Sequence, residues 1–393
     1  MALPCEMIDE ILCRVPVKYV LRCRSVCKDW CSLIDSTAFV KKHLKTSRDR
    51  NAGAGLMIIK VCADQMFYLA SLDSLDEDSA SVVKIRDPLK TLLRGAKYVC
   101  SCNGLMCVLK NLRDVYLLNP VLRKFKKVAS APPEFPSSSK WDERFSFGFG
   151  YDEVNDDYKV VMIEDCCVHF SGLIGFVYSF KTNAWTRIQD IPNNFSFTGI
   201  WGIFANGSLH WTAIKNEINS KDIIVSFDLE LQQFKEVPYP TIEDDSSKMI
   251  FLDGLGENLC IIDCSNSRMD VWLMNYPGAE STWYKALSTE QEEMLRTGTS
   301  NKLIAFSRSG KDLLLQVYNP FGTTLAWYNL NQGTVTIVGI CGLPFHFCSF
   351  LYTESLLQLT EDEPLQQKPS KDKQKKNTKK RRRYKMSCYL CGL

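Results

Sequence analysis

Residues 115–128 read VYLLNPVLRKFKKV, and this short stretch decides the fold class of most of the chain. An apolar run ends at Asn119, and a polar turn leads to a second run that begins near Phe125. Asn and Pro favour turns, and short runs of β-branched and aromatic residues on either side of a turn are typical of a β-hairpin. The stretch therefore predicts two antiparallel strands.

The same hairpin recurs along the chain. Further copies pair residues 177–180 with 185–188, 224–228 with 234–237, 271–274 with 283–286, and 325–329 with 335–338. An apolar strand precedes each copy, often after an Asn-Gly turn, at 103–107, 158–161, 206–211, 257–261 and 311–315. A less regular sixth unit spans Leu56 to Ile85. Small sheets repeated every ~45–60 residues are typical of propeller blades, because one such sheet cannot bury both of its faces alone.

We therefore predict a mainly β protein with a kelch-like β-propeller over residues 48–358, in which six blades are favoured. Seven blades are the alternative, if strands near 341–357 pair with the segment that follows the N-terminal helices. Partners of propellers usually meet loops at one end, because loops carry variable side chains on a rigid frame. The candidate partner-binding loops are 129–146, 189–200 and 239–250.

Residues 1–47 form a second domain, in which apolar residues recur at helical spacing. A first helix, ended by Pro16, carries its apolar face on Met7, Ile8, Ile11, Leu12 and Val15. A second apolar series, which can divide near Arg24, runs to Ile34, and Asp35 or Ser36 can cap a third helix that ends at His43-Leu44. So small a three-helix module cannot bury all of its apolar faces. We expect either the propeller or another protein to cover the excess.

The run from Leu3 to Leu44 resembles the F-box, which it matches at LP (3–4), EIL (10–12), RVPVK (14–18) and LRCRSVCKDW (21–30). The resemblance implies docking on the Skp adaptor of a cullin–RING ubiquitin ligase. The implied adaptor-binding residues are Leu3, Pro4, Ile8, Ile11, Leu12, Val15, Pro16, Leu21, Val26, Cys27, Trp30, Leu33 and Ile34. Trp30 is expected to be among the largest contributors, because buried aromatic side chains commonly dominate interfaces. The alternative is a helical cap that only packs on the propeller.

Two positions depart from the F-box pattern. Val15 stands where leucine is usual, and Ser36-Thr37 replaces the usual proline before Phe39. Neither change removes the apolar face, so we expect weakened docking at most.

The strand region resembles the F-box-associated domain of plant F-box proteins, often called F-box/kelch-repeat proteins. The matching segments are CNGLMC (102–107), LNP (118–120), FGFGYD (147–152), NGSLHW (206–211) and DVW (270–272). In that family this domain binds the substrate, so the resemblance implies a receptor that recruits a target protein for ubiquitination and proteasomal degradation. Members include regulators of plant immune receptors and pollen incompatibility factors, and the sequence does not choose between them.

We do not expect this chain to catalyse a reaction. We predict a non-catalytic adaptor subunit without cofactor or metal. Cys166-Cys167 with His169 is too compressed for a zinc site, and the pair Cys388 and Cys391 lacks two further ligands. The 17 cysteines are scattered, and we interpret most of them as reduced core residues. The alternatives are a propeller enzyme or lectin-like binder with a site at the central channel, and a scaffold that sequesters partners without ubiquitination.

Three acidic residues, Asp152, Asp156 and Asp157, sit in a predicted turn. Side chains of this kind commonly bond to nearby backbone, so we expect them to fix the turn rather than to act as acid or base. His43 and His210 are likewise expected to be structural.

Charge is distributed unevenly around a net value of +3. Residues 1–50 carry +4 and residues 368–385 carry +10, so the remainder carries −11. An acidic body is poorly suited to nucleic acid, and we expect no nucleic acid to bind through the folded domains. No apolar run is long enough to span a bilayer, and we expect a protein of the nucleus and cytoplasm.

The tail, residues 359–393, has no periodicity and is predicted to be disordered. Its basic centre is a nuclear-import candidate made of Lys379, Lys380, Arg381, Arg382 and Arg383. The alternatives are a merely solvated tail and attraction to anionic lipid, helped by acylation of Cys388 or Cys391.

Overall fold

The computed structural model describes most of the chain. The described residues are 4–50, 54–60, 67–76, 80–86, 89–94, 96–110, 114–128, 130–132, 145–165, 172–217, 222–240, 250–256, 258–263, 268–275, 282–290, 300–319 and 322–359. Several predictions fall outside the described residues, namely those on Leu3, Cys166-Cys167, His169, most of the loops 129–146 and 239–250, the import candidate 379–383, Cys388 and Cys391.

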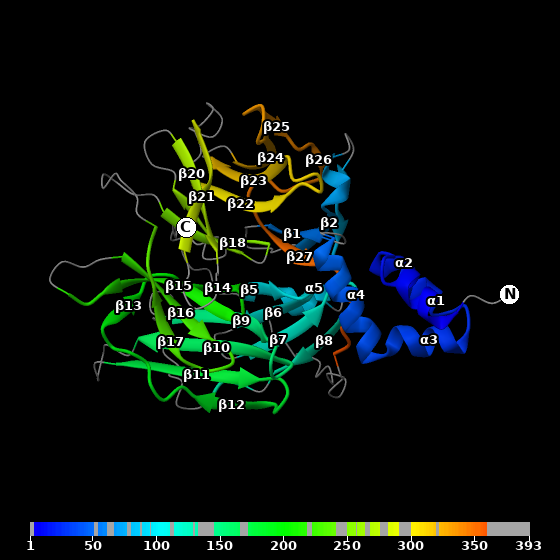
Figure 1. Ribbon diagram of the computed structural model, residues 1–393, viewed down its shortest axis with the longest axis horizontal. Helices are drawn as coiled ribbons and strands as arrows, with labels where there is room; N and C mark the ends of the chain where they lie inside the picture. The colour runs from blue at the N-terminus through cyan, green and yellow to red at the C-terminus, as the bar shows by residue number, and fades with distance from the viewer. Residues whose placement is uncertain are drawn as a thin grey trace, which may run out of the picture.

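The N-terminal module consists of α1 (Cys5–Leu12), α2 (Val17–Cys23), α3 (Lys28–Asp35) and α4 (Thr37–Asp49), and it projects from one side of the strand domain (Figure 1). The second predicted helix is divided at residues 24–27, so the module has four helices where three were predicted. Cys27 caps α3, because its Sγ accepts a hydrogen bond from the Trp30 N–H at 3.5 Å. Ser36 caps α4 as predicted, since its Oγ accepts from the Phe39 N–H at 3.2 Å, but the helix continues past Leu44.

Buried apolar side chains from all four helices pack together in the module's own core: Leu12, Cys13, Val17, Val20, Ile34, Phe39 and Val40. His43 is buried beside them, and its Nε2 lies 2.8 Å from the carbonyl oxygen of Val15. This contact ties α4 to the junction of α1 and α2, which agrees with the structural role expected for His43.

The strand domain is built from four-stranded antiparallel units, and in each regular unit the predicted hairpin forms the last two strands. The first regular unit is β5 (Ala96–Cys102), β6 (Leu105–Lys110), β7 (Asp114–Asn119) and β8 (Lys124–Lys127). The next are β9 (Phe145–Asp152), β10 (Asp157–Asp165), β11 (Leu173–Ser179) and β12 (Ala184–Arg187); β14 (Trp201–Ala205), β15 (Ser208–Lys215), β16 (Asp222–Asp228) and β17 (Phe234–Val237); β18 (Ile250–Leu255), β19 (Asn258–Asp263), β20 (Arg268–Asn275) and β21 (Thr282–Glu290); and β22 (Ser300–Phe306), β23 (Asp312–Asn319), β24 (Gly322–Asn329) and β25 (Val335–Ile337).

A last unit joins the two ends of the domain. β27 (Phe347–Thr353) pairs antiparallel with β1 (Ala54–Lys60), which is followed by β2 (Phe67–Ser71) and β4 (Val83–Lys84). The pairing named for the seven-blade alternative therefore forms, but it completes the irregular sixth unit instead of adding another. The smaller elements are η1 (Asp73–Asp76), β3 (Ala80–Ser81), α5 (Leu89–Leu93), β13 (Phe195–Phe197) and β26 (Ile340–Cys341).

The units are arranged in a closed ring. Their innermost strands β5, β9, β14, β18, β22 and β27 contact one another in this order, and β27 contacts β5 again. Gln316 of β23 reinforces the closure, because its buried Oε1 accepts a hydrogen bond from the Ser349 N–H of β27 at 2.7 Å. A helical module followed by a mainly β, propeller-like domain is thus confirmed. Among the described residues, β9 pairs parallel with β14, so two of the units share one nine-stranded sheet. The blade count of six stays a prediction.

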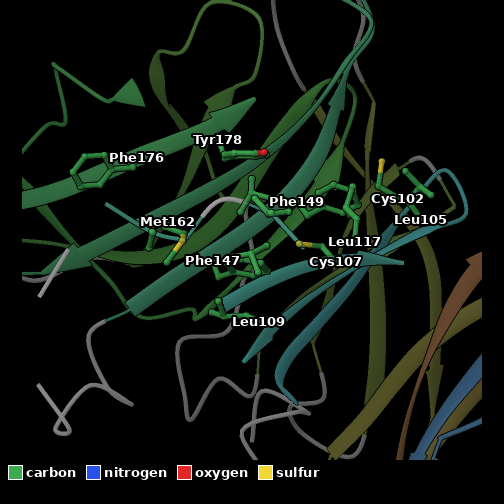
Figure 2. Close-up of a cluster of buried hydrophobic side chains, with 14 of the residues drawn as sticks. Cys102, Leu105, Cys107, Leu109, Leu117, Phe147, Phe149, Met162, Phe176 and Tyr178 are labelled. Atoms are coloured by element: carbon green, nitrogen blue, oxygen red, sulfur yellow. The ribbon is translucent and has the colours of Figure 1, made fainter. Parts of the chain in front are cut away.

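Large side chains fill the space between neighbouring units. Figure 2 shows Cys107 and Leu117 of the first regular unit facing Phe147, Phe149 and Tyr178 of the next. The cysteines at such places are core residues, since Cys102, Cys107 and Cys260 are buried and free, and burial raises the pKa of each thiol. Cys348 of β27 is disulfide-bonded.

The two ends of the propeller have different neighbours. Strands alternate in direction, so the turns after the first and third strand of each unit lie at one end, and the connections between units leave from the other. The helical module sits at the first end, where Lys41 contacts Asp156 of the β9–β10 turn and Arg48 contacts Asn103 of the β5–β6 turn. The candidate loops 129–146, 189–200 and 239–250 all follow the last strand of a unit, so they leave from the opposite end.

A pH effect on stability follows from His210 of β15, which is 2% exposed and whose Nδ1 lies 3.3 Å from the carbonyl oxygen of Ile203. Burial lowers the pKa of His210 from 6.5 to about 4, although backbone hydrogen bonds oppose the shift. Between these two pH values the unfolded chain binds a proton that the folded protein excludes, so stability falls as the pH falls. The loss amounts to about 3 kcal/mol over the window and then levels off.

The measurement is urea unfolding of the wild type and His210→Gln at pH 7, 6 and 5. We expect the variant to lose less stability than the wild type between pH 7 and 5, whatever its stability at pH 7. His346→Gln is the matched control, because it makes the same substitution at an exposed residue. If the stability of the wild type and of His210→Gln falls equally between pH 7 and pH 5, another group causes the acid sensitivity.

Candidate functional site

Exposed apolar side chains are concentrated on the helical module. Ten large apolar residues are exposed in the described part of the chain, and four of them belong to the module: Met7, Ile11, Tyr19 and Val26, at 51%, 50%, 49% and 63% exposure. An apolar surface of this kind marks a site of interaction. The propeller therefore covers only part of the excess apolar surface, and the rest is available to another protein.

In α1, the residues that face the core and the apolar residues that are exposed lie on different sides of the helix. Ile8 and Leu12 face the module's core, whereas Met7 and Ile11 are exposed on the other side. Residues four apart lie on the same side of a helix, so Met7 and Ile11 are neighbours. Pro4 is exposed one turn before Met7 and extends the same stripe. We call the exposed residues Pro4, Met7, Ile11, Pro16, Tyr19 and Val26 the docking surface.

The predicted adaptor-binding residues divide by burial. The exposed ones are Pro4, Ile11, Pro16, Val26 and Cys27. The half-buried ones are Ile8, Val15, Leu21, Trp30 and Leu33. Leu12 and Ile34 are 2% and 1% exposed and belong to the core. A partner can reach the first group directly and the second in part, whereas Leu12 and Ile34 would act through the helices that they hold. As adaptor contacts, all of these residues stay predictions.

Two members of the docking surface were missed as site residues. Met7 lies in the apolar series of the first helix, and its spacing of four from Ile11 was a usable signal. Tyr19 had no such signal, because one aromatic residue between basic neighbours is not a pattern. The Arg22 guanidinium carbon lies 5.5 Å from the centre of the Tyr19 ring, and the Lys18 Nζ lies 6.0 Å from it. This part of the surface is therefore apolar with a basic border, which suits a partner with acidic groups.

A polar contact attaches the module to the propeller. Lys41 Nζ lies 2.6 Å from Asp156 Oδ2, and the Tyr151 hydroxyl donates to Asp156 Oδ1 at 2.5 Å. The hydrogen bonds from Lys41 and Tyr151 lower the pKa of Asp156. Both members of the ion pair are about half exposed, so it contributes about 1 kcal/mol at most. Its main effect is on the orientation of the module.

Of the three acidic residues that were expected to fix the turn behind this contact, Asp152 does so, because its Oδ1 accepts from the Asn155 N–H at 3.0 Å. Asp157 instead holds the neighbouring β11–β12 turn, where its Oδ1 accepts from the Lys181 N–H at 2.8 Å. Below the turn, Lys159 Nζ lies 2.6 Å from Asp152 Oδ2 and donates to the carbonyl of Leu229 at 2.7 Å. Leu229 belongs to the next unit, so Lys159 joins two units beneath the module.

The described residues contain no group of three or more His, Cys, Asp or Glu side chains that could hold a metal ion. Among them, no helix is long and apolar enough to cross a membrane.

The chain thus combines a helical module that exposes apolar side chains with a closed ring of small sheets. Residues 1–42 match the family model of the F-box domain, and residues 58–359 match that of the F-box associated beta propeller domain. The second match alone covers well over half of the chain. The chain therefore belongs to the F-box proteins that carry an F-box-associated β-propeller.

Relatives from Arabidopsis thaliana support this assignment along almost the whole chain. F-box protein CPR1 is 27% identical over 378 residues, which are 90% of this chain and 88% of the relative. F-box/kelch-repeat protein At3g23880 is 31% identical over 295 residues, 73% of this chain and 79% of the relative. F-box proteins of this type are substrate-recognition subunits of SCF ubiquitin ligases, and the F-box domain implies binding to a Skp adaptor.

Proposed function

We propose that this chain binds a target protein through its propeller and presents it to an SCF ligase for ubiquitination and proteasomal degradation. The observation that carries the proposal is the docking surface, an apolar surface on a small module that the propeller leaves exposed. The adaptor would cover it, and the cullin would be reached through the adaptor. The receptor itself would contribute no catalytic residue.

Proximity is the proposed mechanism. A receptor that holds a target lysine near the charged ubiquitin-conjugating enzyme raises the local concentration of the two reactants. This requires a firm connection between docking module and propeller, which Lys41, Asp156 and Tyr151 help to provide. The placement of the module then sets which side of the target faces the enzyme.

The proposed target-binding end is the one opposite to the module. Its loop 189–200 is held in place, because the Thr198 and Gly199 N–H groups donate to the carbonyl of Thr212 at 3.0 and 3.1 Å. The same loop exposes Asn193 and Asn194. Phe345, 68% exposed, lies in the connection before β27 at this end. Ordered polar loops and an exposed aromatic ring at the same end of a propeller suit the recognition of a protein surface.

The proposed biological role follows from the family resemblance, which suggests a regulator of plant immune receptors or of pollen incompatibility. We also propose residence in nucleus and cytoplasm, with residues 379–383 as import signal. Imaging a chain without residues 368–385 tests the second idea, since unchanged nuclear content contradicts it.

Proximity labelling with and without proteasome inhibition tests the function. We expect some labelled proteins to accumulate only under inhibition, and to disappear from the labelled set when Asn193, Asn194 and Phe345 are replaced by Ala. The same triple variant should keep its adaptor, because the three residues lie at the opposite end from the module. Labelled proteins whose levels do not respond to inhibition would favour a scaffold that sequesters partners without ubiquitination.

A further inference from the structure

The segment that follows β27 lies between the propeller and the helical module. We call residues 354–359 the strap. Leu356 is 2% exposed and belongs to the module's core, together with Leu12, Val17 and Val20 among others. Leu359 is 8% exposed and belongs to the propeller core shown in Figure 2. Leu357, between them, packs against both clusters.

Two turns of the first regular unit hold the strap in place. The fully buried Asn119 donates from Nδ2 to the carbonyl oxygens of Ser355 and Leu357, at 3.0 and 3.1 Å. At the other turn, Gly104 has a φ of +79°, and a Cβ there would lie 2.4 Å from the carbonyl oxygen of Thr353. The backbone of the strap thus runs in a defined path directly against the propeller, with Leu356 directed into the module.

We propose that the strap is a working part of the adaptor-docking module, and that Leu356 is a positioning residue for adaptor binding. Leu356 is one of eight buried apolar residues in the module's core, and it is the one supplied from the far end of the chain. A module of about 50 residues is close to the lower limit for independent folding, so it depends on each core side chain. The inference rests on the proposed function, because it assumes that the docking surface binds the adaptor.

Closure of the propeller and docking to the ligase are linked by this arrangement. β27 closes the ring by pairing with β1, and the strap begins at the residue after β27 ends. An open ring therefore leaves Leu356 out of place, and the helices that carry the docking surface lose part of their support.

The experiment compares two leucines of the strap in the full chain, Leu356→Ala and Leu359→Ala. Both changes remove the same atoms from a buried site, but from different cores. We expect Leu356→Ala to weaken adaptor binding about tenfold or more in calorimetry, because deletion of a buried leucine strongly destabilises the core that it leaves. Hydrogen exchange of the amides in α1, α2 and α3 should become faster in the same variant. Leu359→Ala should keep the wild-type adaptor affinity within about twofold, since its cavity lies in the propeller.

Two truncated chains test the same proposal without relying on the folding of Leu356→Ala. A chain that ends at Leu359 retains the strap and should bind the adaptor like the wild type. A chain that ends at Thr353 retains every described strand, yet it should lose most of its adaptor affinity. Leu356→Met should keep the adaptor affinity that Leu356→Ala loses, because methionine fills a volume similar to that of leucine.

Equal adaptor affinity for the wild type and Leu356→Ala would overturn the proposal, and so would an equal loss in Leu359→Ala. In either case the proposed function stands, since the wild type binds. Failure of the wild type itself to bind the adaptor would instead overturn the proposed function together with the role of the strap.

Discussion

A chain that carries Ile11→Asp and Val26→Asp is expected to bind the Skp adaptor about a hundredfold or more weaker than the wild type, while it remains folded. Ile11 and Val26 are 50% and 63% exposed, so the helices do not need them for their core. Covering two such side chains with a partner stabilises a complex by about 1.5–3 kcal/mol each, and each 1.4 kcal/mol changes the affinity about tenfold. The two carboxylates would also have to leave water.

Titration calorimetry with the purified adaptor measures the effect. The matched control is Ile337→Asp with Val83→Asp, which makes the same two chemical changes at residues that are 61% and 64% exposed on outer strands of the propeller. The control should bind like the wild type. If both double variants bind alike, the docking surface is not where the adaptor sits. Leu12 and Trp30 are less suitable targets, because their replacement also damages the module's core.

Replacing Lys159 with Met is expected to destabilise the folded protein by about 3–5 kcal/mol, because it leaves a buried carboxylate without its partner. Lys159 and Asp152 are 7% and 0% exposed at their side chains, so water cannot replace the lost contact. The double variant Lys159→Met with Asp152→Asn should regain much of the loss, since it removes both charges and keeps an acceptor for the Asn155 N–H. Urea unfolding at pH 7 measures the free energy of unfolding of the wild type, the single variant and the double variant.

The pH dependence of the same variants gives an independent check. Burial alone raises the pKa of Asp152, but the hydrogen bonds from Lys159 and Asn155 outweigh it and hold the pKa below its usual range. In the wild type, this contribution to stability is present above the usual carboxyl pKa and is lost as the pH falls through the folded value. Without Lys159, burial dominates and the pKa of Asp152 rises. The loss of unfolding free energy in Lys159→Met, relative to the wild type, should therefore shrink between pH 7 and pH 5. A deficit that is constant with pH, or shared equally by the double variant, would contradict an unpaired charge as the cause.

Much of the propeller is predictable because each hairpin is specified by residues that lie close together in the sequence. Each hairpin has its turn residues between two apolar runs, and the repeat shows that the units stack. The pairing of β1 with β27 is different, since it joins segments almost 300 residues apart and depends on the completed ring. The division of the second helix lies where it was predicted as an option, near Arg24. The start of α3 had no ordinary signal, because α3 is capped by the sulfur of Cys27, and cysteine is not a usual capping residue.

The docking surface was predictable only in part, for a physical reason. Helical spacing shows that Ile8, Ile11 and Leu12 are on apolar sides of α1, but not which side meets the core. Leu12 is buried and Ile11 is exposed, and this depends on how α3 and α4 pack. The strap could not be predicted at all, since Leu356, Leu357 and Leu359 have no periodicity and their role depends on Asn119 and Gly104 of another unit.

The strap places one core residue of the first domain just after β27, the last described strand. During synthesis, the ribosome releases α1 to α4 long before Leu356 is made, so the emerging helices lack a member of their core. On the proposed role of the strap, we expect a chain cut before Leu356 to compete poorly for the shared adaptor. The order of the sequence would then favour receptors that have been synthesised through the strap.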